Sequence, residues 1–191
     1  MRQWLKCSAL LSTINIQVPT IRQCTLDDVT DLSALAKRTF SETFIDTCTD
    51  DDLKEFVVEN YDPVKISWEI TNSHHIYFAL SGQGVPIGYI QFSDSPVPFL
   101  LPMDVKRPLE LSRLYVLKNQ ICNGIGRMLM DFFIAWAKAH SHDYLWLGVW
   151  EHNERAIAFY TKYGFRATGF THSFPIGSTP QTDQWWYKRL N

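Results

Sequence analysis

The sequence has 191 residues, which is the size of one domain with a short extension. Hydrophobic residues make up 46% and charged residues 20% of the chain, so it can bury a core and is not of the disordered class. The 18 Lys and Arg residues nearly balance the 20 Asp and Glu residues, giving a formal net charge of -2. This balance argues against a protein that coats nucleic acid or an anionic membrane, and we expect neither partner.

The cysteines and the first residues of the chain bear on its location. The cysteines, Cys7, Cys24, Cys48 and Cys122, form no CxxC pair. Free thiols in a reducing compartment are therefore expected, and the predicted location is cytoplasmic. Polar residues interrupt the segment 1–19, which fits neither a signal sequence nor a membrane span. We assign 1–19 to an N-terminal extension and 20–191 to the domain.

Hydrophobic spacing and turn residues divide the domain into short helices and strands. In chain order they predict a strand at 20–24, helices beginning near 29, 50 and 63, a hairpin of strands at 76–80 and 85–92, a strand at 109–117, a helix at 124–140, a strand at 144–150, a helix at 153–163 and strands at 166–174 and 182–190. Residues 93–108 hold four prolines and are predicted to form a loop. This order predicts an α/β domain with a mixed sheet.

Two glycines at a predicted strand-to-helix turn suggest a phosphate-binding site. Gly124 and Gly126 open the helix at 124–140. Glycines there let backbone N–H groups approach a phosphate, and the helix N-terminus adds about half a positive charge. Leu129 replaces the third glycine of the dinucleotide fingerprint, and the Gly-Lys-Ser/Thr of the Walker motif is absent. The glycines alone do not decide between a binding site and a simple turn.

A second motif follows the strand at 144–150. It is Asn153-x-x-Ala156-x-x-Phe159-Tyr160-x-x-x-Gly164-Phe165. Together with the glycine turn, it resembles the GNAT superfamily of acetyltransferases, whose pyrophosphate motif is Q/R-x-x-G-x-G/A. The likeness covers about residues 20–190. The segments Thr43-Phe44, 49–51, 146–153, 172–174 and 181–183 are similar to those of the bacterial spermidine/spermine N-acetyltransferase subgroup.

The resemblance implies a fold and a set of contacts with acetyl-CoA. We expect a mixed central sheet of about seven strands with flanking helices, in which the fourth and fifth strands splay apart. The pantetheine arm would fill the gap like an extra strand, beside a bulge at Leu114-Tyr115-Val116, with an amide near Tyr115 pointing at the thioester oxygen. The residues expected to bind acetyl-CoA are Leu114, Tyr115, Val116, Ile121, Cys122, Asn123, Gly124, Ile125, Gly126, Arg127, Asn153 and Tyr160. No metal is expected.

The glycine turn departs from the family pattern at one position. Ile121 stands where the motif has Gln or Arg, and Gln120 comes one residue early. An isoleucine side chain cannot donate a hydrogen bond to phosphate. Because backbone amides are the main donors of such a turn, we expect binding to survive, with Arg127 as a substitute for the missing polar group.

Two residues are predicted to move protons. In the family, the tyrosine of the second motif protonates the departing CoA thiolate, which assigns this role to Tyr160. Helical spacing alone would make Tyr160 a core aromatic residue, but Asn153 and Gly164 stand in register with the motif. Glu110, at the start of the central strand, is predicted to be the base; a solvated carboxylate at the strand end is the open alternative. Glu151 and the segment 50–52 are further candidates.

The acceptor is predicted to be a primary amine, attacked directly in a ternary complex. The resemblance to the spermidine/spermine subgroup makes a polyamine the first choice. A set of acidic residues would steer such a polycation toward the cleft, although helix capping explains them almost as well: Asp46, Asp50, Asp51, Asp52, Glu55 and Glu59. Acetylation of a protein N-terminus or lysine is the second reading. A degenerate acyl-CoA-binding regulatory module is the third. A homodimer is compatible with such folds.

Other conspicuous residues lie near predicted strand ends. Trp146 and Trp150 are expected to face the same side of their strand, with Trp150 the better candidate for a pocket wall. His152 is either a pocket residue or a polar strand end. The turn His140-Ser141-His142-Asp143 has no third ligand in view and is predicted to be exposed rather than to bind metal.

Overall fold

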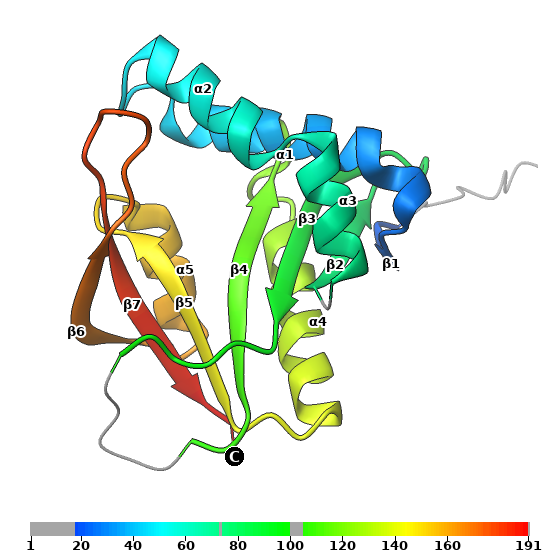
Figure 1. The fold of residues 1–191 in the computed structure, drawn as a ribbon. Coiled ribbons are helices and arrows are strands. Elements are labelled where there is room, and N and C mark those ends of the chain that lie inside the picture. Colours follow the sequence, from blue (N-terminus) through cyan, green and yellow to red (C-terminus); the bar gives the residue numbers. More distant parts are fainter. Residues whose placement is uncertain (1–17, 73, 100–104, 191) are drawn as a thin grey trace, which may run out of the picture.

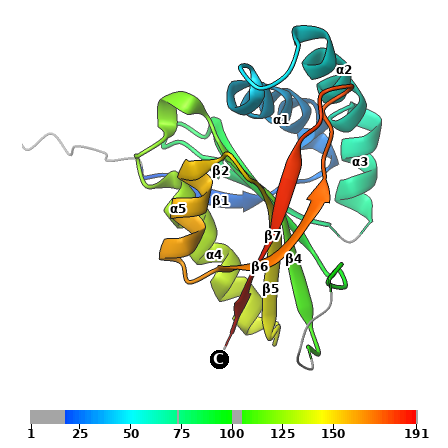
Figure 2. The same ribbon diagram turned by 90° about the vertical axis from the view of Figure 1, so that its left-hand side faces the viewer.

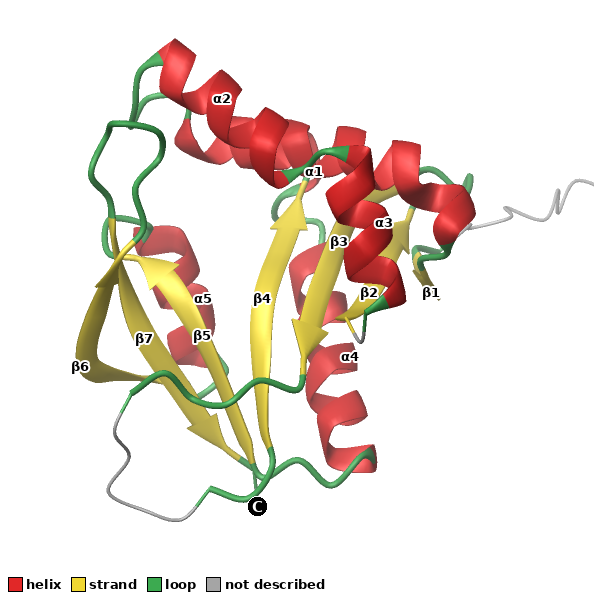
Figure 3. Cartoon of the chain, viewed as in Figure 1, coloured by secondary structure: helices red, strands yellow, loops and turns green. Residues whose placement is uncertain are grey.

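The computed structural model describes residues 18–72, 74–99 and 105–190, so most of the predicted extension lies outside the described residues. The described chain forms one seven-stranded sheet with helices on both faces (Figures 1 and 3). The strands are β1 (Thr20–Gln23), β2 (His74–Leu80), β3 (Pro86–Ser93), β4 (Pro108–Val116), β5 (Tyr144–Trp150), β6 (Arg166–Ser173) and β7 (Thr182–Arg189). The helices are α1 (Val29–Phe44), α2 (Asp50–Asn60), α3 (Pro63–Thr71), α4 (Ile125–Ala139) and α5 (Glu154–Lys162), with short 3-10 turns η1 (Leu26–Asp28) and η2 (Lys118–Gln120).

The sheet is mixed, as predicted. Its strand order is β1-β2-β3-β4-β5-β7-β6, and β4 and β5 form the parallel pair. Helix α4 makes the crossover between them. Figure 2 shows α1 and α3 on one side of the sheet and α4 and α5 on the other. None of the helices in the described ranges is long and apolar enough to cross a membrane.

Strands β4 and β5 part halfway along their length, which confirms the expected splay. They are paired over three residue pairs, the last being Glu110 with Trp146. Beyond this point β4 continues to Val116 and β5 to Trp150 without pairing to each other. Figure 1 shows the two strands diverging toward the helix α1. The wedge between them leaves one edge of each strand free of a protein partner.

The bulge of β4 lies at Ser112 and not at Leu114-Tyr115-Val116, so that expectation was wrong. Leu111 and Arg113 pair with neighbouring residues of β3, which leaves Ser112 as the extra residue. The insertion reverses the alternation of side chains along the strand. Arg113 consequently faces helix α3 rather than α4. The physical reason is a buried carboxylate on α3 that pairs with the Arg113 guanidinium.

That partner is Glu69 of α3. The Arg113 guanidinium donates to the two carboxylate oxygens of Glu69 at 2.7 and 3.0 Å, and to the side-chain oxygen of Gln91 at 2.7 Å. It also lies 4.9 Å from the centre of the Tyr61 ring. Both ends of the pair are largely removed from water, since the side chains are 15% and 7% exposed. This pair fixes the splayed half of β4 to the helical layer.

Candidate active site

The free edge of β4 presents backbone groups to the wedge. Leu117 N–H donates to the Ile87 carbonyl at 3.0 Å, so these two residues form a hydrogen-bonded pair of the β3–β4 ladder. Backbone N–H groups alternate in direction along an antiparallel strand. Tyr115 therefore also points its N–H at β3, whereas Leu114 and Val116 point theirs into the wedge. Of the three predicted strand contacts, the backbones of Leu114 and Val116 are placed to bind an extended ligand.

The glycine turn leads from this edge into α4. Cys122 and Gly124 adopt left-handed conformations, with φ of 69° and 81°. The first hydrogen bond of the helix runs from Met128 N–H to the Gly124 carbonyl at 2.9 Å. The N–H groups of residues 125–127 precede that bond and have no helical acceptor. These amides and the helix dipole form a site suited to an anion, which is the geometry predicted from Gly124 and Gly126.

A cavity of about 370 Å³ opens between α1, the end of β5 and the start of α5. It is lined by Glu42, Thr43, Lys118, Trp150, His152, Asn153, Glu154 and Arg155. Asn153 is the N-cap of α5, because its side-chain oxygen accepts from Ala156 N–H at 3.1 Å. Capping orients the Asn153 side chain at the cavity wall. Glu42 accepts from Lys118 N–H at 2.8 Å and ties α1 to the turn after β4.

A smaller cavity places Ile121 beside two cations. It shares Glu42, Thr43, Lys118 and Arg155 with the larger one and adds Thr39, Val116 and Ile121. Arg155 makes no ion pair with the described residues. Arg127, the substitute predicted from sequence, is exposed and lines neither cavity. Arg155 was not among the binding residues predicted from the sequence. Its place in the first turn of the predicted helix at 153–163, two residues after Asn153, is the sequence feature that points to it.

Tyr160 lies on the face of α5 that packs against the sheet. Its ring contacts Phe159 and Phe165, with centroids 5.6 and 5.8 Å away, and the residue is 9% exposed. Burial raises the pKa of the Tyr160 phenol above its usual value. The hydroxyl makes no hydrogen bond to the described residues. The phenol is therefore protonated at neutral pH, and its proton is not committed to another protein group.

Glu110 is located where β4 and β5 separate. Its partner in the parallel ladder is Trp146, the last paired residue of β5. Burial raises the pKa of Glu110, and hydrogen bonding to Ser95 and the charge of Arg113 counteract part of that increase. A carboxylate with a raised pKa at the fork of the wedge has the position and the basicity of a proton acceptor.

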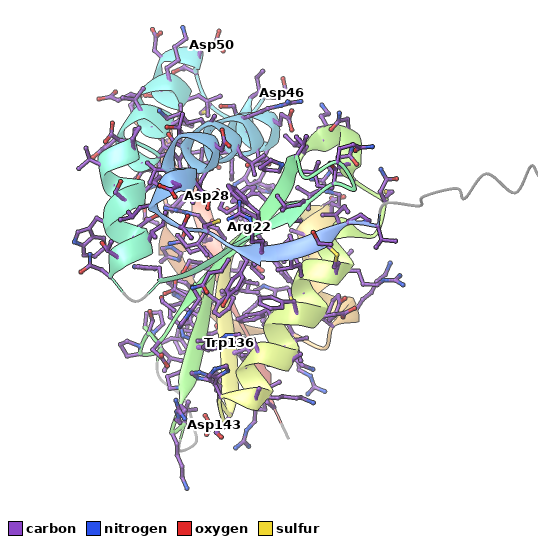
Figure 4. The ribbon with its side chains drawn as sticks, turned by 90° about the vertical axis from the view of Figure 1, so that its right-hand side faces the viewer. Arg22, Asp28, Asp46, Asp50, Trp136 and Asp143 are labelled. Carbon is purple, nitrogen blue, oxygen red and sulfur yellow. The ribbon has the colours of Figure 1, made fainter. Side chains whose placement is uncertain are left out.

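The acidic residues of α1 and α2 divide into two groups. Figure 4 shows Asp46 and Asp50 at the outer end of these helices with their side chains directed away from the fold, and Asp51 is equally exposed. Asp52 instead accepts from Ser178 N–H at 2.8 Å and from the Thr179 hydroxyl at 2.7 Å. These hydrogen bonds, that from Ser178 first, lower the pKa of Asp52 to about 2. Asp52 therefore fastens the β6–β7 loop to α2 and is not suited to act as a base.

The tryptophans of β5 have different surroundings. Trp146 is buried, and its indole N–H donates to the Ser95 carbonyl at 3.2 Å. The ring centroids of Trp150 and Phe44 of α1 are 5.4 Å apart. Trp150 and the exposed His152 both line the larger cavity. The Glu151 carboxylate is only loosely paired with His152, since its Oε1 lies 3.8 Å from His152 Nε2. Trp150 thus has the position expected of a pocket wall, and Trp146 that of a packed residue.

The histidine turn after α4 serves the packing of the chain. Asp143 accepts from the backbone N–H groups of Lys106 and Arg107 at 3.1 and 2.9 Å. His142 is buried rather than exposed, and its Nδ1 lies 3.2 Å from the Arg107 carbonyl. In Figure 4 Asp143 lies at the opposite end of the molecule from Asp50. Among the residues that the structure describes, no group of three or more His, Cys, Asp or Glu side chains is arranged to hold a metal ion.

Comparison with known proteins gives relatives over most of the chain. The model of the acetyltransferase (GNAT) family matches residues 31–165. An uncharacterized N-acetyltransferase of Lactobacillus delbrueckii subsp. lactis is 31% identical over 166 residues, which are 85% of this chain and 92% of the relative. An uncharacterized N-acetyltransferase of Mycobacterium bovis is 28% identical over 83% of this chain and 95% of its own length.

Solved structures share the fold. The PaiA N-acetyltransferase of Thermoplasma acidophilum, crystallised in complex with coenzyme A, superposes with a TM-score of 0.73 at 19% identity, covering 90% of this chain and 99% of that chain. A GCN5-related N-acetyltransferase of Rhodopseudomonas palustris gives a TM-score of 0.70 at 17% identity, over 94% of this chain and 100% of that chain. The overall fold of this chain is thus shared with solved N-acetyltransferase structures.

Proposed function

This chain belongs to the acetyltransferase (GNAT) family and is an acetyl-CoA-dependent N-acetyltransferase, and we propose that its acceptor is a small primary amine of the polyamine type. The observation that supports the site of transfer best is the wedge between β4 and β5. Its β4 edge carries the free N–H groups of Leu114 and Val116, and the same strand leads to the N-terminus of α4. An extended ligand with an anionic end matches both features.

The residues that would hold acetyl-CoA follow the chain from strand to helix. Leu114 and Val116 would bind the pantetheine amides, and the N–H groups of the turn at 121–127 would bind the diphosphate. Asn153 lines the cavity beside this path, and Arg155 and Lys118 would supply the positive charge that Ile121 does not. Acetyl-CoA supplies the acetyl group as an activated thioester. An N–H of β4 directed at the thioester carbonyl oxygen would stabilise the negative charge that develops on this oxygen by roughly 3 kcal/mol.

The amine must lose a proton before or during its attack. Alkyl ammonium groups have a pKa near 10.4, roughly, so a base is needed at neutral pH. In the proposed reaction the neutral nitrogen forms a bond to the acetyl carbon, the carbon–sulfur bond breaks, and Glu110 takes the proton from nitrogen directly or through water. Tyr160 donates its proton to the departing thiolate. The products are the acetamide and CoA with a free thiol.

Charge supports a cationic acceptor. The exposed carboxylates of the α1–α2 region, namely Asp46, Asp50, Asp51, Glu55 and Glu59, create a negative surface that attracts polycations. The family likeness of the acceptor segments to the spermidine/spermine subgroup points in the same direction. A cytoplasmic location, predicted from the cysteines, and a homodimeric state remain part of this proposal.

A thiol-release assay tests the proposal. Acetyl-CoA is supplied with spermidine, spermine, an amino-acid amide and a peptide with a free N-terminus and a lysine. Release with the two polyamines and not with the others is expected. Release with the peptide alone would replace the polyamine proposal by protein acetylation. No release above the rate without acceptor, despite measurable acetyl-CoA binding, would favour a regulatory acyl-CoA-binding module.

Gly126→Asp tests the diphosphate site. A Cβ at this position would lie 3.8 Å from the Phe159 ring, which is an ordinary contact, and an acidic side chain suits the first turn of a helix. The fold should therefore tolerate the change. A charge about 4 Å from a phosphate costs roughly 3–4 kcal/mol near a protein surface, so acetyl-CoA affinity should fall at least about 100-fold.

Gly126→Asn is the matched control, because it has the same size without the charge. Calorimetric titration with acetyl-CoA should give a much smaller loss for this variant. Equal losses for the two variants would mean that steric blocking, and not charge at the helix N-terminus, governs the site. Unchanged affinity in both would place the diphosphate elsewhere.

A further inference from the structure

Three buried polar atoms without a hydrogen-bond partner lie in one row across β5, β7 and β6. In the sheet register Trp150 is opposite Asp183, and Asp183 is opposite His172. The unpartnered atoms are Trp150 Nε1, Asp183 Oδ1 and His172 Nδ1. Directly paired residues of antiparallel strands point to the same face, so the three side chains are neighbours. Buried polar groups are normally hydrogen-bonded, so three adjacent atoms without a protein partner form a place suited to a polar ligand.

The sheet makes room for this cluster at Gly148. A Cβ on Gly148 would lie 3.2 Å from Asp183 Oδ2 and 3.3 Å from His172 Cε1. The glycine therefore allows the carboxylate and the imidazole to converge over β5. Trp185 stacks on His172, with ring centroids 3.9 Å apart and planes at 8°. The result is a carboxylate held among aromatic rings.

Asp183 has no countercharge within the part of the chain that the structure describes. Burial raises the pKa of Asp183 to about 6, and the neighbouring Glu151 adds to the increase. Burial also lowers the pKa of His172, which is consequently neutral at pH 7. At neutral pH the cluster therefore contains an ionised, partly desolvated carboxylate. Such a charge is costly unless a cation pairs with it.

We propose that Asp183 binds a second ammonium group of the acceptor and so selects diamines over monoamines. This inference rests on the proposed function, because it assigns a residue to the acceptor of that reaction. The attacking nitrogen has to be uncharged and has to reach the wedge between β4 and β5. Asp183 lies on β7, across β5 from the wedge. The cation that neutralises Asp183 is therefore a different nitrogen of the same acceptor. Trp150 lies between the wedge and Asp183, because it lines the larger cavity and stands opposite Asp183 in the sheet register.

Cadaverine and pentylamine test the inference, because they share a carbon chain and differ in the second ammonium group. Their binding to the CoA-saturated protein is measured by calorimetry, and their acetylation by thiol release. The unmodified protein should bind cadaverine at least about tenfold more tightly than pentylamine, as expected for a charge-assisted pair. Asp183→Asn should abolish this preference with acetyl-CoA affinity unchanged. Asp27→Asn, which removes the same charge from an exposed residue of η1 near the opposite edge of the sheet, should keep it.

The outcomes separate this inference from the proposed function. Equal affinity for the two amines in the unmodified protein, absence of binding by either, or a preference that survives in Asp183→Asn would overturn the role of Asp183. An equal loss of turnover with both amines in Asp183→Asn would also overturn it, because it would indicate a part in the reaction itself. A cadaverine preference that depends on Asp183, without any acetyl transfer, would refute the proposed function and leave a diamine site. Thermal unfolding confirms that each variant folds.

Discussion

Tyr160→Phe should reduce the turnover number by about 100- to 10,000-fold, the range expected when a general acid is removed. The substitution deletes one oxygen and leaves the ring in its contacts with Phe159 and Phe165. Without the phenol, the CoA thiolate has to leave unprotonated or take its proton from water. Acetyl-CoA affinity should remain within about twofold, because in the proposed site the backbone groups of the wedge and the turn provide most of the binding. Steady-state kinetics and calorimetry measure the two effects separately.

Tyr144→Phe is the control for this experiment. Tyr144 also has a buried phenol without a hydrogen-bond partner, but it lies at the start of β5, where β4 and β5 are still paired. Its loss should leave turnover unchanged. If Tyr160→Phe retains full turnover, or if both variants lose it to the same extent, Tyr160 is not the acid.

Arg113→Met should reduce the free energy of unfolding by about 3–5 kcal/mol, the usual cost of leaving one member of a buried ion pair without its partner. Glu69 would remain 5% exposed with no cation in contact, and Gln91 would lose a hydrogen bond of 2.7 Å. Since stabilities of domains this size are only about 5–15 kcal/mol, the loss should be evident in urea unfolding. The variant should also free the splayed half of β4 from α3.

The double variant Glu69→Leu with Arg113→Met separates charge from packing. Apolar replacement of both members of a buried pair is often nearly neutral, so most of the lost stability should return. A single variant that loses less than about 1 kcal/mol would mean that the pair is effectively solvated. A double variant as unstable as the single one would mean that shape, and not the isolated carboxylate, causes the loss.

Local sequence signals were sufficient for the elements and for the motifs. Gly124 and Asn153 could be interpreted from residue type alone, since each has a local role. Gly124 adopts a left-handed turn conformation, and the Asn153 side chain caps a helix. The strands at 109–117 and 144–150 and the helix between them follow from periodicity, and the family resemblance supplied the parting of β4 from β5. The observed sheet agrees with these expectations.

Features that depend on distant partners could not be predicted from the sequence. The bulge at Ser112 exists because Arg113 meets Glu69, 44 residues away in the chain. Asp52 stands in an acidic run that is typical of an exposed helix start. Its burial depends on hydrogen bonds from the β6–β7 loop, which lies more than 120 residues later in the chain. Arg155 and Asp183 gain their significance only from the side chains that the fold gathers around them.

Amide hydrogen exchange along β4 tests the central claim most directly. We expect the N–H groups of Leu114 and Val116 to exchange rapidly in the free protein and to become protected when acetyl-CoA is added, because they face the wedge. The N–H groups of Tyr115 and Leu117 face β3 and should be protected from the start. Unchanged exchange at Leu114 and Val116 under saturating acetyl-CoA would contradict binding between the parted strands.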